Sequence, residues 1–337
     1  VVTGVSGSGK TTLILESLIP GLKASIEGKK LPDHVKEVKA EGISQVKLID
    51  AAPIGINVRS TVATYANVHD ELRKIFARTP DAKALGYKAG DFSYNTGKLR
   101  CPVCDGTGSI SLDVQFLPDV QITCPQCRGA RYAKEAEAVR LDVAGTGKGK
   151  AAQQDVADTK AKKKESAEGS AGGKKANPAG NSETYSLPQL MSMDVNHALE
   201  VCKNLRLVRQ RLQVLQDLGL GYLTLGEETP SLSGGEAQRL KLASEMGKTQ
   251  SDSVFVFDEP TIGLHPLDVR TLLGVFQTLI ENGATVIVIE HDLDVIRNAD
   301  YIIDMGPGGG QEGGKIVATG TPEEIKKAPE SRTGQFL

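Results

Sequence analysis

The sequence predicts an α/β fold built around a mostly parallel β-sheet. Two apolar runs, at residues 254–257 and 285–289, have the unbroken hydrophobic character of parallel strands that are buried on both faces. A helical pattern at about residues 266–282 lies between them. Because strand, helix and strand in succession form the unit from which parallel sheets are built, these three segments together predict the sheet.

The composition excludes several classes of protein. The 337 residues are 39% hydrophobic and 24% charged, which is ordinary for a globular protein with more than one module. The net charge of −2 gives no overall basic field, so a surface for nucleic acid would have to be local. The apolar run at residues 284–289 is far shorter than the roughly 18 residues of a membrane helix, and no secretory signal pattern is present. We therefore expect a cytoplasmic protein without a membrane partner.

A phosphate-binding loop lies near the start of the chain. Residues 4–11, Gly-Val-Ser-Gly-Ser-Gly-Lys-Thr, fit the pattern G-x-x-x-x-G-K-[ST] in full. A β-branched run at residues 1–3 precedes the loop and a helical segment at about 11–18 follows it, which argues against a chance glycine-rich turn. Lys10 would reach the β- and γ-phosphates, and Thr11 would coordinate Mg²⁺. The predicted ATP-binding residues are Gly4, Ser6, Gly7, Ser8, Gly9, Lys10, Thr11 and Thr12.

A second motif narrows the class of nucleotide-binding protein. Residues 232–239, Leu-Ser-Gly-Gly-Glu-Ala-Gln-Arg, form the signature that separates ATP-binding-cassette (ABC) proteins from other phosphate-loop ATPases. The signature opens a predicted helix, whose first N–H groups can bind a γ-phosphate. In ABC proteins that phosphate belongs to the ATP held by the opposite head, so catalysis needs two heads. The residues predicted to contact ATP in trans are Ser233, Gly234, Gly235 and Glu236.

The acidic pair and a histidine supply the expected reaction chemistry. Asp258 and Glu259 follow the apolar run at residues 254–257, where Asp258 would hold Mg²⁺ through water and Glu259 would polarise the attacking water. His291 follows the next apolar run and stands where ABC proteins carry a sensor of the γ-phosphate. We therefore predict Glu259 and His291 as catalytic residues. The predicted fold is an ABC-type phosphate-loop ATPase core with a helical signature subdomain.

Four of the five cysteines form two C-x-x-C pairs, Cys101 with Cys104 and Cys124 with Cys127. Their spacing fits the pattern of a structural Zn²⁺ site. Four thiolates complete a tetrahedron and leave no open position, so the predicted metal is structural and not catalytic. Disulfide bonds are the alternative, which a reducing compartment disfavours. Cys202 has no partner at such a spacing and is expected to be a small buried hydrophobic residue.

The order of the motifs divides the chain into five segments. Residues 144–182 are rich in Gly, Ala, Lys, Ser and Gln and cannot bury enough apolar surface to form a core, so we expect a flexible linker. Because the chain starts inside a strand-like run, we interpret it as a fragment whose upstream part is missing. The predicted segments are the first part of the ABC head at 1–99, the zinc module at 100–133, the linker at 144–182, the helical signature subdomain at 183–252, and the second part of the head at 253–337.

With these motifs in place, the chain resembles the C-terminal half of the UvrA family, the damage-sensing ATPases of bacterial excision repair. The resemblance covers nearly the whole chain apart from the linker. Its most specific parts are residues 2–11, 116–120, 232–239 and 289–296. It implies two ABC heads in one chain, with the N-terminal head absent here, a homodimer, ATP-dependent binding of damaged duplex DNA, and delivery of the damaged site to a UvrB-like protein.

The sequence departs from the UvrA pattern at two positions. The family carries a glutamine where this chain has Ala51, and an arginine where it has Ile56. The chain keeps Arg59, which the resemblance assigns to DNA binding. These departures leave open a UvrA-like ABC ATPase that has diverged to drug or toxin resistance. A transporter ATPase subunit is a further alternative, although transporter heads carry no zinc module.

Overall fold

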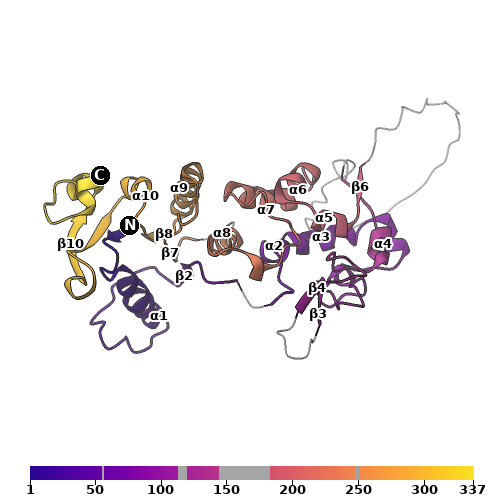
Figure 1. The fold of residues 1–337 in the computed structure, drawn as a ribbon, viewed down its shortest axis with the longest axis horizontal. Helices are drawn as coiled ribbons and strands as arrows, with labels where there is room; N and C mark the ends of the chain where they lie inside the picture. Colours follow the sequence, from indigo (N-terminus) through magenta and orange to yellow (C-terminus); the bar gives the residue numbers. More distant parts are fainter. Residues whose placement is uncertain (55–56, 113–119, 144–182, 247–249) are drawn as a thin grey trace, which may run out of the picture.

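A six-stranded sheet forms one lobe of the molecule, at the left of Figure 1. The computed structural model describes residues 1–54, 57–112, 120–143, 183–246 and 250–337. Within these residues the strand order is β10-β9-β1-β8-β7-β2, in which only β10 is antiparallel. The strands are β1 (Val2–Gly4), β2 (Gln45–Ile49), β7 (Ser253–Asp258), β8 (Thr285–Ile289), β9 (Ile302–Gly306) and β10 (Lys315–Gly320). The predicted mostly parallel sheet is therefore confirmed.

Strand β7 is buried on both faces, as its unbroken apolar run predicts. Phe255 and Phe257 face a core that continues beneath α9 (Pro266–Glu281) and into the second lobe. Val254 and Val256 point the opposite way, because side chains alternate along a strand, and they pack against residues of β1 and of the first helix. The sheet is thus sandwiched between two apolar layers. The remaining helices of this lobe are α10 (Leu293–Arg297) and α11 (Pro322–Ile325), with the short 3₁₀ turns Gly310–Glu312 and Thr333–Phe336.

The first helix is longer than the predicted segment at 11–18. Its opening turns, Thr12–Leu18, are wound as a π-helix, and α1 (Ile19–Ile26) continues it. Pro20 has no N–H to donate to the carbonyl of Glu16, four residues earlier, and His34 Nε2 lies 3.1 Å from that oxygen. A proline within the helix is therefore accommodated by a change of winding, so the helix does not end there.

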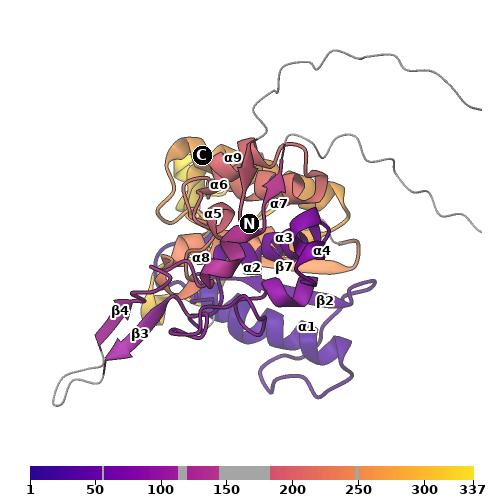
Figure 2. The ribbon, with the colours of Figure 1, turned by 90° about the vertical axis from the view of Figure 1, so that its right-hand side faces the viewer.

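A second lobe, at the right of Figure 1, is built from short helices. Its helix α7 (Arg206–Asp217) carries the predicted apolar stripe: Val208, Leu212 and Leu215 are fully buried, and Leu205 precedes them in the same core. A two-stranded ribbon projects from this lobe (Figure 2). The elements are α2 (Val62–Tyr65), α3 (Val68–Phe76), α4 (Pro80–Ala84), η2 (Ala89–Phe92), β3 (Ser109–Leu112), β4 (Val120–Thr123), η3 (Lys134–Ala138), β5 (Leu141–Asp142), β6 (Thr184–Tyr185), α5 (Leu187–Met191), α6 (Val195–Val201) and α7 (Arg206–Asp217).

The signature helix α8 (Gly234–Glu245) lies between the two lobes (Figure 1). Gln238, in its second turn, donates from Nε2 to the carbonyl oxygens of Ile49 and Asp258, each at 2.9 Å. The helix is therefore fastened to the ends of β2 and β7. The 3₁₀ turn η5 (Thr229–Ser231) leads into it.

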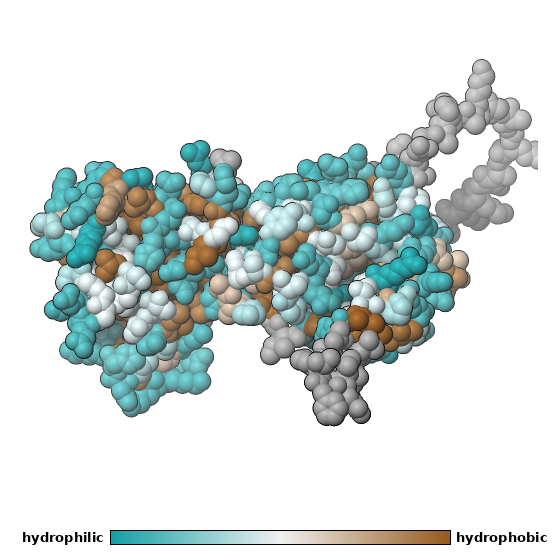
Figure 3. Space-filling model, in the orientation of Figure 1, coloured by the Kyte–Doolittle hydropathy of each residue, from teal (hydrophilic) through white to brown (hydrophobic). Residues whose placement is uncertain are grey.

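An isolated antiparallel bridge joins Arg100 and Tyr132, which lie near the two ends of the predicted zinc module. This bridge closes the cysteine-bearing segment at its base. The predicted linker at residues 144–182 lies outside the described residues, as does most of the 116–120 stretch. Figure 3 shows a largely hydrophilic face with small, scattered apolar areas. In the part of the chain that the structure describes, every helix is too short or too polar to cross a membrane.

Candidate nucleotide-binding site and cysteine cluster

The phosphate loop leaves β1 at Gly4 and enters the first helix after Thr11. Gly4 has φ +133°, and a Cβ there would lie 2.0 Å from the carbonyl oxygen of Met305, so only glycine fits. Lys10 is buried, and its Nζ donates to the carbonyl oxygens of Gly4 and Val5 at 3.1 and 3.0 Å. Burial lowers the pKa of Lys10, while nearby carboxylates oppose the shift. The ammonium group therefore lies against the backbone at the start of its own loop.

A second glycine-rich loop, residues 307–314, braces the phosphate loop from outside. The N–H groups of Gly310 and Gly314 donate to the carbonyl oxygens of Gly7 and Ser8 at 3.1 and 2.9 Å. In a trans peptide the N–H points away from the carbonyl of the same peptide unit. Fixing these two carbonyls toward the brace therefore turns the following N–H groups to the opposite side. Sequence reasoning did not assign this role, although the run of glycines at 306–314 was its visible signal.

The acidic pair lies at the same edge of the sheet as the phosphate loop. Strand β8 separates β1 from β7, and all three run parallel, so their carboxyl ends coincide. Adjacent strands lie about 4.8 Å apart, which places the two loops about 10 Å from each other, a distance that Mg²⁺ and a triphosphate can span. Burial and the neighbouring Glu259 raise the pKa of Asp258, whereas Lys10 lowers it, so these three charges occupy one electrostatic environment.

The predicted catalytic residues meet across two loops. His291 follows β8, and its Nε2 lies 3.5 Å from Oε1 of Glu259. Glu259 itself has φ +46°, a strained conformation for a residue other than glycine, asparagine or aspartate. Three adjacent strands therefore deliver Lys10, Glu259 and His291 to one place, as the order of the motifs predicts.

The signature motif forms the capped first turn of α8. Ser233 caps α8: its Oγ accepts from Glu236 N at 3.4 Å, and Glu236 Oε2 accepts from Ser233 N at 2.7 Å. The hydroxyl of Tyr222 donates to Glu236 Oε1 at 2.5 Å. A Cβ on Gly234 or Gly235 would meet Ala51 and Ile262 respectively, neither of which belongs to the phosphate loop. Ser233 and Gly234 are exposed, so the turn is open to a ligand from outside the chain.

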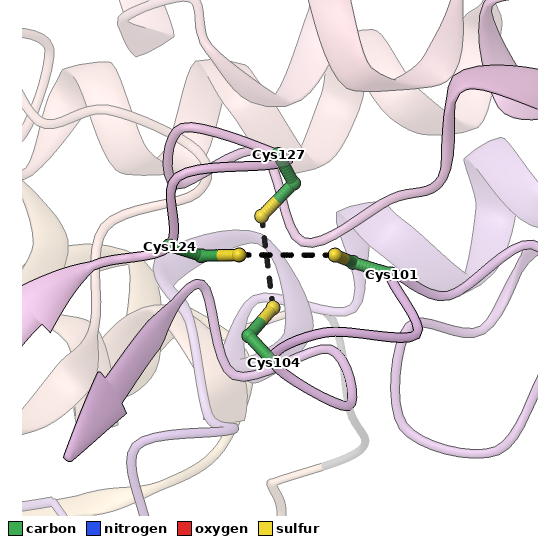
Figure 4. A group of neighbouring side chains, drawn as sticks. All are labelled: Cys101, Cys104, Cys124 and Cys127. Carbon is green, nitrogen blue, oxygen red and sulfur yellow. Dashed lines mark hydrogen bonds between the residues drawn. The ribbon is translucent and has the colours of Figure 1, made fainter. Parts of the chain in front are cut away.

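The four paired cysteines converge on one point (Figure 4). Their sulfur atoms all lie within 4.8 Å of one another, with Cys101 to Cys124 at 3.9 Å and Cys104 to Cys127 at 3.6 Å. A tetrahedral Zn²⁺ with Zn–S bonds of about 2.3 Å needs sulfur atoms about 3.8 Å apart, so the cluster fits that ion. Cys202 lies apart from them and is buried, and burial raises the pKa of its thiol to about 12.

Backbone geometry turns the thiols inward. Each C-x-x-C pair is followed by two residues with positive φ: Asp105 and Gly106 at 50° and 78°, and Arg128 and Gly129 at 51° and 87°. Burial raises the pKa of the Cys124 thiol, but hydrogen bonds from the backbone N–H groups of Cys127 and Gln126, together with those of the Cys127 and Cys104 side chains, lower it to about 7. Amide dipoles directed at a sulfur favour the thiolate, which is the form that binds metal.

Comparison with known proteins finds sequence similarity to UvrA proteins along the whole chain. No protein-family model matches the chain. The UvrABC system protein A of Bacillus subtilis is 44% identical over 339 residues, which cover 100% of this chain and 31% of that protein. The corresponding Aquifex aeolicus protein is 43% identical over 341 residues and is covered to 32%. The chain is homologous to UvrA along its whole length.

A solved structure agrees with the sequence relationship. The crystal structure of UvrA2 from Deinococcus radiodurans superposes with a TM-score of 0.76 at 35% identity, covering 99% of this chain and 36% of that one. The predicted fold class is therefore confirmed. The chain spans about a third of the length of the curated UvrA relatives that it matches.

Ala51, which replaces the glutamine expected of UvrA proteins, lies between the end of β2 and the signature helix. Lys241 of α8 holds this segment: its Nζ donates to the carbonyl oxygens of Asp50 and Ala52 at 3.0 and 2.7 Å and pairs with the Asp50 carboxylate at 2.5 Å. A lysine therefore tethers the segment to α8. Ile56, the second departure from the UvrA pattern, lies outside the described residues.

Arg59, the predicted DNA-binding residue, sits on the first cysteine knuckle. Its guanidinium donates to the carbonyl oxygen of Asp105 at 2.7 Å and to its carboxylate at 3.0 Å, and Arg100 pairs with the same carboxylate at 3.0 Å. Two arginines therefore share one carboxylate at the first cysteine knuckle.

The cysteine module is joined to the signature segment by an ion pair of a buried arginine and a partly exposed glutamate. Arg131 is 3% exposed, and it donates to Glu228 Oε1 at 2.8 Å and to the carbonyl of Val58 at 3.0 Å. Its guanidinium also lies over the ring of Tyr94, 5.4 Å from the centroid. Because Glu228 directly precedes the turn that leads to the signature, the two parts share one rigid connection.

Proposed function

We propose that this chain is the ATP-hydrolysing, DNA-binding part of a UvrA-type protein of nucleotide excision repair. The observation that carries the proposal is the meeting of Lys10, Glu259 and His291 at one sheet edge, in a chain homologous to UvrA throughout. The whole protein would recognise damaged duplex DNA and load a UvrB-like partner. We expect the protein to act in the cytoplasm.

The residues of the site divide the work of ATP hydrolysis. Lys10 would bind the β- and γ-phosphates, with amides of residues 4–12 around them. Thr11 and Asp258 would hold Mg²⁺, whose charge offsets that of the triphosphate. Glu259 would orient and polarise the attacking water, and His291 would contact the γ-phosphate. The signature turn at residues 233–236 starts with the exposed Ser233 and Gly234, which supports a site completed by a second head, and hence a homodimer.

Zn²⁺ would supply structural stability to the cysteine module. Cys101, Cys104, Cys124 and Cys127 offer four sulfur ligands, the donor set of closed structural sites. Arg100 lies at the surface of the module, Arg59 contacts it through Asp105, and Arg131 lies at its base. This placement supports a module that presents positive charge to DNA while it is fastened to the signature segment.

The test uses the full-length gene product, because two heads are needed. Binding to damaged and intact duplexes is measured with a non-hydrolysable ATP analogue over a salt titration, together with ATP turnover. We expect salt-dependent DNA binding that favours the damaged duplex. Absence of DNA binding even at low salt would overturn the repair function.

Divergence toward resistance is the second candidate, and Ala51 is the observation that favours it. If the intact gene restores survival of an ultraviolet-sensitive, repair-deficient strain, the divergent function is excluded. Failure to restore survival, together with intact ATP turnover, would favour it.

A further inference from the structure

Glu290 is a buried carboxylate beside the nucleotide site that the predicted machinery does not use. Glu290 lies between the end of β8 and His291 and is only 2% exposed. A charged group removed from water is costly unless its oxygens are satisfied. The contacts of these oxygens therefore indicate what the residue does.

Each carboxylate oxygen of Glu290 serves a different loop. Oε1 accepts from the backbone N and the Oγ1 of Thr261, at 2.9 and 2.5 Å. Oε2 accepts from the backbone N of His291 and of Asp292, at 2.6 and 3.0 Å. Four donors thus satisfy one carboxylate, with two from each loop. Hydrogen bonds to a charged acceptor are stronger than those between neutral groups.

The two loops carry the predicted catalytic groups. Thr261 belongs to the turn that starts at Glu259, and Ile262 N closes this turn by donating to Glu259 O at 3.2 Å. On its other side the same turn contacts the signature helix, since a Cβ on Gly235 would lie 3.1 Å from Ile262 O. The Ile262 side chain is 61% exposed. A contact on this turn from outside would therefore move the backbone to which Glu259 is attached.

We propose that Glu290 is a positioning residue that couples the turn at residues 259–263 to the loop of His291. Displacement of the turn by the signature helix or by a second head is passed through the carboxylate to His291, so the distance between Glu259 and His291 follows the state of the interface. The inference deepens the proposed ATPase and rests on it. Glu290 touches neither nucleotide nor water in this role.

The decisive variant is Glu290→Gln in the full-length protein. An amide keeps the size of the side chain, but its NH₂ cannot accept, so one of the two loops loses its acceptor for two donors. We expect kcat for ATP hydrolysis to fall at least about 30-fold while KM for ATP changes less than about threefold. Glu281→Gln, an exposed glutamate on α9, is the matched control and should keep wild-type kinetics.

Thr261 supplies the second arm. Thr261→Val removes the Oγ1 donor and keeps the backbone N–H, so a smaller fall in kcat is expected, and Thr261→Ser should restore it. If both residues act through one link, the Glu290→Gln, Thr261→Val double variant loses no more than Glu290→Gln alone. Additive losses would show independent structural roles and overturn the coupling.

The outcomes separate this inference from the proposed function. Wild-type protein without ATP turnover overturns the ATPase and the coupling together. Wild-type turnover with an unchanged kcat in Glu290→Gln overturns the coupling alone. If Glu290→Gln does not fold, the Thr261→Val and Thr261→Ser pair decides, because a loss in the first without rescue in the second contradicts the link.

Discussion

The cysteine cluster and the nucleotide site are assembled in opposite ways. The cluster draws all its ligands from residues 101–127, two knuckles held by their own backbone turns. The nucleotide site draws on the ends of β1, β7 and β8 and on a brace at residues 307–314, so nearly the whole chain separates its parts. The cluster is complete within one chain, whereas the nucleotide site proposed above takes its signature residues from a second head.

The two sites differ in whether neighbouring residues or the strand order of the whole sheet determine their geometry. A knuckle needs only its own spacing and positive φ at the residues that follow. A site spread over parallel strands needs the strand order to be right before any two of its residues meet. We therefore expect changes at the cluster to affect metal content and stability, and changes at the nucleotide site to affect turnover at constant fold.

The largest effect is expected from metal loss. Cys124→Ser removes one of four thiolates, and the binding free energy of structural Zn²⁺ is on the order of 10 kcal/mol, much of which stabilises the fold. Wild-type protein should contain about one zinc per chain and the variant close to none, measured by metal analysis, with a lower melting temperature. Cys202→Ala, a buried cysteine outside the cluster, should keep its zinc. Full zinc content in Cys124→Ser would contradict a metal site that depends on all four thiolates.

The next largest effect concerns turnover. Glu259→Gln keeps the size of the side chain and removes the carboxylate that would polarise water, so kcat in the full-length protein should fall at least about 100-fold. ATP binding, measured by equilibrium titration, and zinc content should stay as in the wild type. Lys10→Ala should instead lose both binding and turnover. Normal hydrolysis in either variant would contradict the assigned roles.

The stability of the second lobe should depend on pH through the buried His69, which lies outside the nucleotide site. His69 of α3 is buried and its Nε2 lies 2.7 Å from the hydroxyl of Tyr132, which itself donates to Phe92 O, so Nε2 is the donor in this contact. Burial, with Arg73, lowers the pKa of His69 from 6.5 to about 3. Between these values the unfolded state binds more protons, so stability falls as pH drops.

The loss should approach about 1.4 kcal/mol per pH unit below 6.5, or on the order of 2 kcal/mol by pH 5. Denaturant unfolding at a series of pH values measures it. His69→Gln should flatten the slope in this window, and His197→Gln, an exposed histidine, should leave it unchanged. An unaltered slope in His69→Gln would assign the pH dependence to other groups.

The smallest effect is expected at the brace of the phosphate loop. A Cβ on Gly313 would lie 3.0 Å from Ser8 Cα and 3.2 Å from Gly7 O, so Gly313→Ala should push the loop and raise KM for ATP about tenfold, or about 1.4 kcal/mol. At Gly308 the Cβ meets the flexible side chain of Glu312, so Gly308→Ala should have little effect. Equal KM values for ATP in both variants would show that residues 307–314 do not support the phosphate loop.

The sequence predicted the parts of the molecule that depend on local pattern. The phosphate loop, the signature cap, the strand before Asp258 and the four-cysteine cluster lie where their residues indicated. Glu290 escaped prediction because its partners come from two separate loops and its bonds run largely to backbone atoms, which leave no residue-type signal. The glycines of the brace are visible in the sequence, but their partners in the phosphate loop lie about 300 residues away along the chain, so their role appears only in the fold. The first helix passed its predicted end because a change of winding accommodates Pro20.

The most direct test is a structure of the full-length protein with Mg²⁺ and a non-hydrolysable ATP analogue. The account predicts one nucleotide whose β- and γ-phosphates contact Lys10, with Asp258 beside the magnesium ion, His291 toward the γ-phosphate, and Ser233 on the phosphate of a different head. A nucleotide that contacts Lys10 while Asp258 and His291 of the same head remain remote would contradict it.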